Sequence, residues 1–241
     1  MGAATSAALL PARAIRRMAA ALAAAAPVIF WIGRCTDLDL ALADAVFDAA
    51  SGAFPWRHAW LAETFGHVIL KSLLMLLALG FIGRALADLA WPRAAMSGQA
   101  RLRLRIVALS ALLVPLAISV LKQFSTSHCP WDLLRYGGDQ PYVRLFEALP
   151  AGAVAGQCLP AGHASSALWL VSLAVYWLPA RPPMAGAAVG YLQQLRGAHF
   201  MTHTLWSIWI ACAIVLFLAA ALRARPSNPL SETVHVATAD Q

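Results

Sequence analysis

Five titratable side chains lie at or near the ends of apolar segments, where lipid solvates them poorly. Lys122 ends one such segment in AISVLKQ, and His163 begins another in PAGHASS. Arg196, His199 and His203 follow in LRGAHFMTH. A charged group costs about 2.5–3.5 kcal/mol at the bilayer centre on insertion scales, so such groups usually mark function. These five residues are therefore the first candidates for chemistry.

The last of these groups has the spacing of one helix face. Steps of three, four and four residues join Arg196, His199, His203 and Ser207. Side chains at such steps lie above one another on a helix, and a polar stripe faces protein or water rather than lipid. A purely structural network between helices would give the same stripe, so the stripe alone does not establish catalysis.

A lysine, an arginine and two histidines suit the handling of a phosphate group. Lys122 and Arg196 would bind a dianionic phosphate, and a guanidinium can hold two of its oxygens. One histidine could attack phosphorus while the other protonates the leaving oxygen. Pro160 favours a first helical turn whose amides face an anion, and Gly162 leaves room for a phosphate to approach. PAGH is thus predicted to bind phosphate and to supply a general acid.

The elements that must position these residues are membrane helices. The 241-residue chain is 61% hydrophobic and 12% charged, where soluble domains carry about 25% charged residues. We therefore predict an all-α, polytopic membrane protein, a six-transmembrane-helix bundle with an outer interfacial helix. The expected spans are residues 18–33, 68–85, 106–124, 163–178, 184–195 and 204–222.

Basic residues predict the orientation of these spans, because cytoplasmic loops carry the excess of lysine and arginine. Arginines precede the first expected span, separate the second from the third, and follow the sixth. Both termini are therefore expected in the cytoplasm, and segments 34–67, 125–162 and 196–203 outside. Segment 34–67 is partly amphipathic and is expected along the outer interface. The polar residues 226–241 are expected to be a disordered cytoplasmic tail after a single domain of residues 1–225.

The net charge of +7 does not indicate a nucleic-acid partner. The basic residues lie between apolar segments and form no patch interleaved with exposed aromatic residues. They are interpreted as topology signals, and the sequence makes no prediction about oligomeric state.

The ordered motifs resemble those of the membrane-bound type 2 phosphatidic acid phosphatase (PAP2) superfamily, whose pattern is K-x6-R-P, P-S-G-H and S-R-x5-H-x3-D. Here Lys122 precedes Cys129-Pro130, PAGH ends at His163, and Arg196 precedes His203 and Ser207. The resemblance implies that Lys122, Arg196 and the backbone at Gly162 hold phosphate. It implies that His203 attacks phosphorus to form a phosphohistidine, that His163 protonates the leaving group, and that no metal or other cofactor is needed. The implied partner is a lipid phosphate in the membrane.

The first two motifs depart from the family pattern. Cys129 replaces the first arginine, so one phosphate-binding cation is missing, and the neighbouring His128 could take its place. Ala161 replaces a serine but keeps the backbone amide.

The third motif departs further. Leu195 replaces its serine, and His203 follows Arg196 by seven residues instead of six, with Thr202 at the family position. Ser207 replaces the aspartate that would orient the nucleophilic imidazole. His199 remains a rival nucleophile, with His203 as its partner one helical turn later.

Two cysteines lie in the long outer loop, beside the first and second motifs. An oxidising periplasm permits a Cys129–Cys158 disulfide, and closing about 30 residues would contribute roughly 3–4 kcal/mol in the chain-entropy model. The alternative is two unpaired thiols. His199 and His203 have the spacing H-x3-H of a zinc site, but no third ligand is evident in the sequence.

We therefore expect a lipid phosphate phosphatase that hydrolyses a phosphomonoester or pyrophosphate headgroup at the periplasmic face of a bacterial inner membrane. Polyprenyl pyrophosphate, phosphatidic acid, phosphatidylglycerol phosphate and lipid A phosphate are all compatible substrates. The alternatives are a lipid phosphotransferase using the same phosphohistidine, a non-catalytic lipid-binding protein, and a transport protein with a histidine relay. The last would spread polar residues through the depth of several spans, whereas here they gather at one face.

Overall fold

The computed structural model describes residues 9–175, 190–191 and 193–222, and its regular elements are all helical. Four helices are long and apolar enough to cross a membrane. They are α1 (Ala12–Cys35), α3 (Leu70–Ala90) with the preceding π-helix η1 (Leu61–Ile69), α4 (Gly98–Gln123) and α7 (Met201–Ala221). The prediction of an all-α, multi-pass membrane protein is confirmed.

The structure does not show the six spans expected from the sequence. The first, second, third and sixth correspond to the four helices above. Of the fourth, residues 163–175 are described, whereas residues 176–178 and most of the fifth, 184–189 and 192, lie outside the described part of the chain. Of that region the structure describes α5 (Gly162–Leu168), the 3-10 helix η4 (Trp169–Val175) and helical residues 190–191 and 193–195. The expected tail, residues 226–241, is also outside the described residues.

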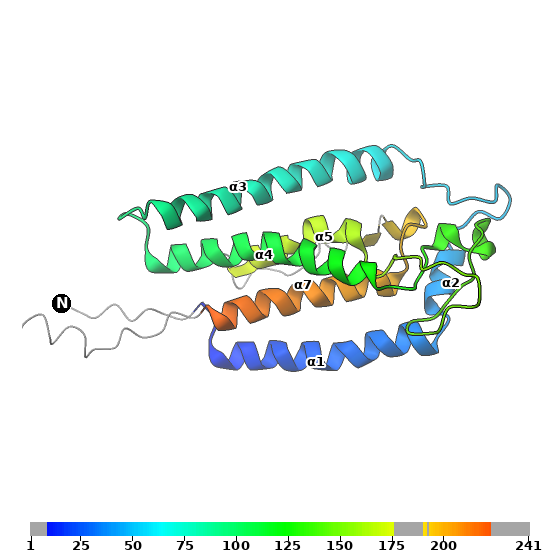
Figure 1. Ribbon diagram of the computed structural model, residues 1–241, viewed down its shortest axis with the longest axis horizontal. Coiled ribbons are helices and arrows are strands. Elements are labelled where there is room, and N and C mark those ends of the chain that lie inside the picture. The colour runs from blue at the N-terminus through cyan, green and yellow to red at the C-terminus, as the bar shows by residue number, and fades with distance from the viewer. Residues whose placement is uncertain (1–8, 176–189, 192, 223–241) are drawn as a thin grey trace, which may run out of the picture.

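The long helices run side by side, with α5 against α4 and α7 (Figure 1). The main core forms where α4 and α7 face each other, around Ile106, Val114, Ile118 and Ala211, and Trp169 of η4 closes it. By contrast, α1 and α3 expose most of their apolar side chains. Burial by lipid accounts for those exposed faces, because a membrane helix needs no polar outer side.

One end of the bundle carries the loops that hold the motifs (Figure 1). There α4 ends, α5 and α7 begin, and the short helix α2 (Leu38–Asp44) packs against α7. The start of α1, the end of α7 and the connection between α3 and α4 all lie at the opposite end (Figure 1). The direction of the helices therefore brings the three motifs to one end of the bundle.

The loop between α4 and α5 is tied down at several points. It contains the 3-10 helices η2 (Pro130–Asp132) and η3 (Leu134–Tyr136), and a Cys129–Cys158 disulfide closes it, with the two Cα atoms 5.4 Å apart. Arg135 donates to both carboxylate oxygens of Asp44 at 2.8 and 2.7 Å. Arg144 donates to the carbonyl of Thr36 and to the carboxylate of Asp37. The loop is thus docked on the corner between α1 and α2.

Candidate active site

The first two motifs meet at Lys122 and Gly162. Lys122 lies in the last turn of α4 and is half-buried, and Gly162 is the first residue of α5. A β-carbon at Gly162 would lie 3.8 Å from both Cδ and Nζ of Lys122. That is ordinary van der Waals contact, so packing within the chain does not demand glycine here. The glycine instead leaves open the space beside the ammonium group.

The second and third motifs are joined through backbone hydrogen bonds. The amide of Ala161 donates to the carbonyl of His203 at 3.2 Å. The hydroxyl of Ser207 lies between the same two residues, 3.2 Å from the carbonyl of Ala161 and 3.0 Å from that of His203. Lys122 is close enough to act electrostatically on the His203 imidazole. The ends of three helices therefore converge around His203.

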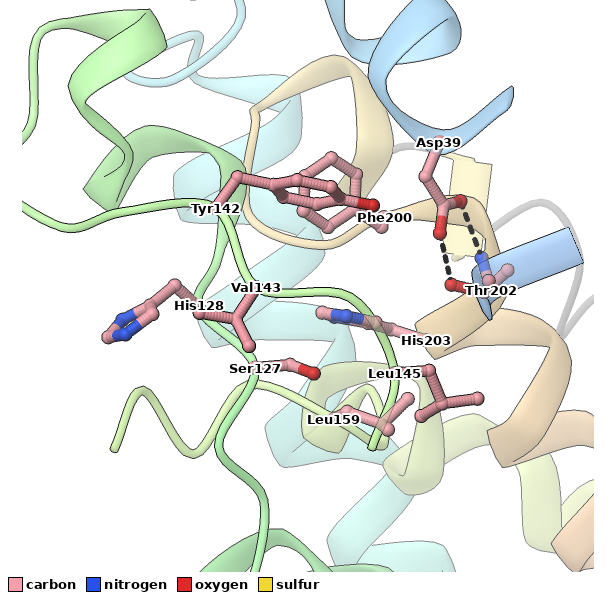
Figure 2. Close-up of a pocket in the computed structure, with 11 residues that line it drawn as sticks. Asp39, Ser127, His128, Tyr142, Val143, Leu145, Leu159, Phe200, Thr202 and His203 are labelled. Atoms are coloured by element: carbon pink, nitrogen blue, oxygen red, sulfur yellow. Dashed lines mark hydrogen bonds between the residues drawn. The ribbon is translucent and has the colours of Figure 1, made fainter. Parts of the chain in front are cut away.

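His203 is only 4% exposed and lines a small cleft with Ser127, His128 and Leu159 (Figure 2). Phe200 meets its ring edge to face, with centroids 5.4 Å apart. Its Nδ1 atom is buried and has no hydrogen-bond partner among the described residues. One nitrogen of this imidazole is therefore unpaired within the described chain.

His128 borders the same cleft, but its ring points away from His203 (Figure 2). It is 5% exposed, and its Nε2 finds no partner within the described chain. Gly156 packs so closely on it that a β-carbon there would come within 2.4 Å of Nδ1. The loop thus holds His128 rigidly beside the position where the family has its arginine.

Ser207 does not reach the imidazole that the sequence comparison assigns to it. Both of its hydrogen bonds go to backbone carbonyls, of Ala161 and His203. The hydroxyl has one proton, which it shares between the two carbonyls, and a carboxylate has no proton to donate. In this structure Ser207 therefore holds the backbone of the site.

Arg196 faces a different neighbourhood from Lys122. Its Nε donates to the carbonyl of Arg57 at 3.2 Å and its Nη1 to Oε1 of Gln193 at 3.3 Å. Burial lowers the pKa of Arg196, while Glu63 acts in the opposite sense. Within the described contacts, the structure does not bring Arg196 to Lys122 or Gly162.

His199 and His163 complete the set of expected site residues. The ring of His199 is 5.9 Å from that of His203, centroid to centroid, and its Nδ1 lies 3.3 Å from Sγ of Cys158. His163 lies in the first turn of α5, next to Gly162. Its side chain is outside the described part of the structure, so its expected role as the acid stays a prediction.

One group of potential metal ligands gathers within the described residues. The sulfurs of Cys129 and Cys158 and a ring nitrogen of His199 lie within 4.8 Å of one another. The two sulfurs are bonded to each other, whereas metals bind the free thiolate. In the oxidised form this group therefore offers a metal only the imidazole.

Asp39 is a site residue that the sequence did not single out. It lies in α2, is 4% exposed, and its Oδ1 accepts a hydrogen bond from the backbone amide of Thr202 at 3.0 Å. The hydroxyl of Thr202 donates to the other carboxylate oxygen (Figure 2). Several aspartates crowd this stretch of sequence, and only the docking of α2 shows which one is buried.

A bundle of membrane helices with a lysine, histidines and a helix start converging at one end defines a membrane phosphatase-type domain. The pattern of the PAP2 superfamily matches residues 103–227. This is just over half of the chain and includes all three motifs, so the chain belongs to the PAP2 superfamily, whose activity is that of a phosphatase-type hydrolase. No curated protein and no solved structure matches the chain.

Proposed function

We propose that this protein removes phosphate from a lipid phosphomonoester or pyrophosphate at the outer face of a bacterial inner membrane, through a phosphohistidine intermediate. The observation that carries the proposal is the convergence of Lys122, Gly162 and His203. A cation, an open space and an imidazole meet where α4 ends and α5 and α7 begin. These are the parts that phosphoryl transfer to a histidine requires.

In the proposed reaction the phosphate lies beside the Lys122 ammonium group, in the space that Gly162 leaves open. The imidazole of His203 attacks phosphorus, and the bond from phosphorus to the leaving oxygen breaks. His163 gives a proton to that oxygen and then takes one from a water molecule. This water attacks the phosphohistidine, which releases inorganic phosphate and restores His203.

The remaining expected residues take supporting roles in this proposal. Arg196 would need to release the Arg57 carbonyl before it could grip a phosphate oxygen. His128 borders the cleft that His203 lines. It is the candidate to replace the phosphate-binding cation that is missing because position 129 is a cysteine. Ser207 would act by holding the His203 backbone.

The distribution of arginines supports a periplasmic location of the site. The connection between α3 and α4 and the start of α4 lie at the opposite end of the bundle from the site (Figure 1) and carry Arg93, Arg101, Arg103 and Arg105. Because cytoplasmic segments carry the excess of lysine and arginine, the arginines at that opposite end support a site that faces the periplasm and termini that face the cytoplasm.

The test is release of inorganic phosphate by the purified protein from phosphatidic acid, phosphatidylglycerol phosphate, polyprenyl pyrophosphate and lipid A, with EDTA present. His203→Ala and His163→Ala should each lose at least about a hundredfold in activity, the scale expected of an essential nucleophile or acid. His58→Ala is the matched control, because His58 is an exposed histidine bound to Glu63 at the same end of the bundle. It should keep full activity.

The same preparations decide between the two histidines. With a radiolabelled phosphate donor, an acid-labile label should form on wild type and be absent from His203→Ala. A label that persists in His203→Ala and disappears in His199→Ala would make His199 the nucleophile. Transfer of the label to an added lipid alcohol, rather than to water, would identify a phosphotransferase.

A further inference from the structure

The first turn of α7 lacks a cap of its own. Phe200 occupies the N-cap position and makes no side-chain hydrogen bond. The initial amides of a helix have no partner within the helix and are normally satisfied by a Ser, Thr, Asp or Asn at that position. Here the cap comes from another helix, because Asp39 of α2 accepts the amide of Thr202.

Asp39 holds Thr202 at two points, since the threonine hydroxyl also donates to its carboxylate. The methyl carbon of Thr202 would meet a β-carbon at Gly33 of α1 at 3.5 Å, so the side chain is packed as well as bonded. His203 follows directly in the chain, and its carbonyl accepts from Ala161 and Ser207. The backbone around His203 is therefore held from the α2 side and from the α5 side.

Burying the Asp39 carboxylate is energetically unfavourable. Burial raises the pKa of Asp39, against the lowering effect of its bonds to Thr202. Within the described chain no lysine or arginine forms an ion pair with it, and a buried unpaired charge opposes folding. The start of a helix is an environment that favours an anion, but the arrangement still costs more than a neutral cap would.

We infer that Asp39 is a positioning residue for the proposed reaction, anchoring the first turn of α7 so that His203 stands at a fixed place beside Gly162 and Lys122. The inference rests on the proposed function for its catalytic consequence. Asp39 also lies outside residues 103–227, the part that matches the superfamily. The amino-terminal segment would thus complete the active site of the matching region.

Steady-state kinetics on the full-length protein tests this inference. Asp39→Ala should lower kcat by at least about tenfold, since small misplacements of a reacting group can cost up to about a hundredfold. KM should change by less than about threefold, because Lys122 and Gly162 are untouched. Asp39→Asn keeps one acceptor oxygen and should fall between wild type and Asp39→Ala.

Variants of Thr202 provide a second, independent test. Thr202→Val keeps the methyl beside Gly33 but loses the hydroxyl, and should lower kcat in the same way, whereas Thr202→Ser should be close to wild type. Adding Thr202→Val to Asp39→Ala should cause no further loss, because both changes break the same contact. The matched control is Asp88→Asn, which changes a carboxylate that is 3% exposed at the opposite end of the bundle, paired with Arg101.

Hydrogen exchange separates failure of this inference from failure of the proposed function. Amides of residues 200–206 should exchange faster in Asp39→Ala than in wild type, whatever the substrate. If the wild-type protein hydrolyses no lipid phosphate, the proposed function is wrong. Faster exchange in Asp39→Ala would still support the role of Asp39 in holding the first turn of α7. Unchanged exchange with unchanged kcat in Asp39→Ala, or an equal loss of kcat in Asp88→Asn, would overturn the inference.

Discussion

The amide of Ala161 donates a 3.2 Å hydrogen bond to the carbonyl of His203, which joins the start of α5 to the first turn of α7. The two residues belong to separate motifs, and the hydroxyl of Ser207 bonds to the carbonyls of both. Geometry at the site therefore depends on backbone contacts between helices as much as on the side chains proposed for catalysis.

Gly162→Ala should impair binding without harming the fold. The added methyl meets Lys122 only at 3.8 Å, and replacing glycine by alanine in a compatible conformation stabilises by about 0.4–1 kcal/mol. The same methyl would occupy the space proposed for the phosphate, and a misfit of roughly 1–3 kcal/mol corresponds to about a fivefold to 150-fold increase in KM. KM and melting temperature should be measured together. Gly80→Ala, at a position with no atom within 4 Å, is the control, and an unchanged KM in Gly162→Ala would place the phosphate elsewhere.

Ser207→Asp should destabilise the protein although it restores the family residue. A carboxylate at this fully buried position would face the carbonyls of Ala161 and His203 and could donate to neither. Ser207→Ala removes the hydrogen bond that this hydroxyl shares between the two carbonyls and should cost about 0.5–1.5 kcal/mol, and Ser207→Asp should melt lower still. Thermal unfolding in detergent compares the three proteins. An aspartate variant that is more stable or more active than wild type would show that position 207 serves the imidazole instead.

Breaking the Cys129–Cys158 disulfide should loosen the loop that carries the first motif. The bridge spans a sequence separation of 29 residues, for which the chain-entropy model gives roughly 3–4 kcal/mol. Replacing both cysteines by alanine, or reducing the protein, should lower the melting temperature and the phosphatase activity. The control replaces Cys35 and Cys212, which are free. Two alkylatable thiols at positions 129 and 158 together with bound zinc in the purified protein would contradict the disulfide and point to the ligand group with His199.

Acid should release the loop from α2 through Asp44. The hydrogen bond from Arg135 lowers the pKa of Asp44 below the ordinary value of 3.8. A carboxyl whose pKa is lowered on folding stabilises above its unfolded pKa, and this contribution disappears as pH falls through the folded value. The effect is small because the pair is half exposed. Pepsin cleavage of residues 133–145 should therefore rise below about pH 4 in wild type relative to Asp44→Asn, in which the contact is weakened at every pH. A constant ratio between the two proteins across that range would exclude this contact as the acid-sensitive one.

Much of the architecture could be predicted from the sequence because hydropathy is a local property. Four of the expected spans correspond to long helices, and the all-α class is confirmed. The order of Lys122, His163, Arg196 and His203 was enough to predict the PAP2 superfamily, which is confirmed. The pairing of Cys129 with Cys158 was also expected, since both lie in one loop.

The partners of individual side chains were decided only by the tertiary structure. Arg196 bonds to Arg57 and Gln193, and Ser207 bonds to two carbonyls, although the motif pattern assigns both to phosphate chemistry. Asp39 resembles its neighbouring aspartates in sequence, yet it alone reaches the start of α7. Such contacts join residues far apart in the chain and depend on how α2, α5 and α7 dock. A motif therefore determines which groups are present, and the packing of helices determines which of them meet.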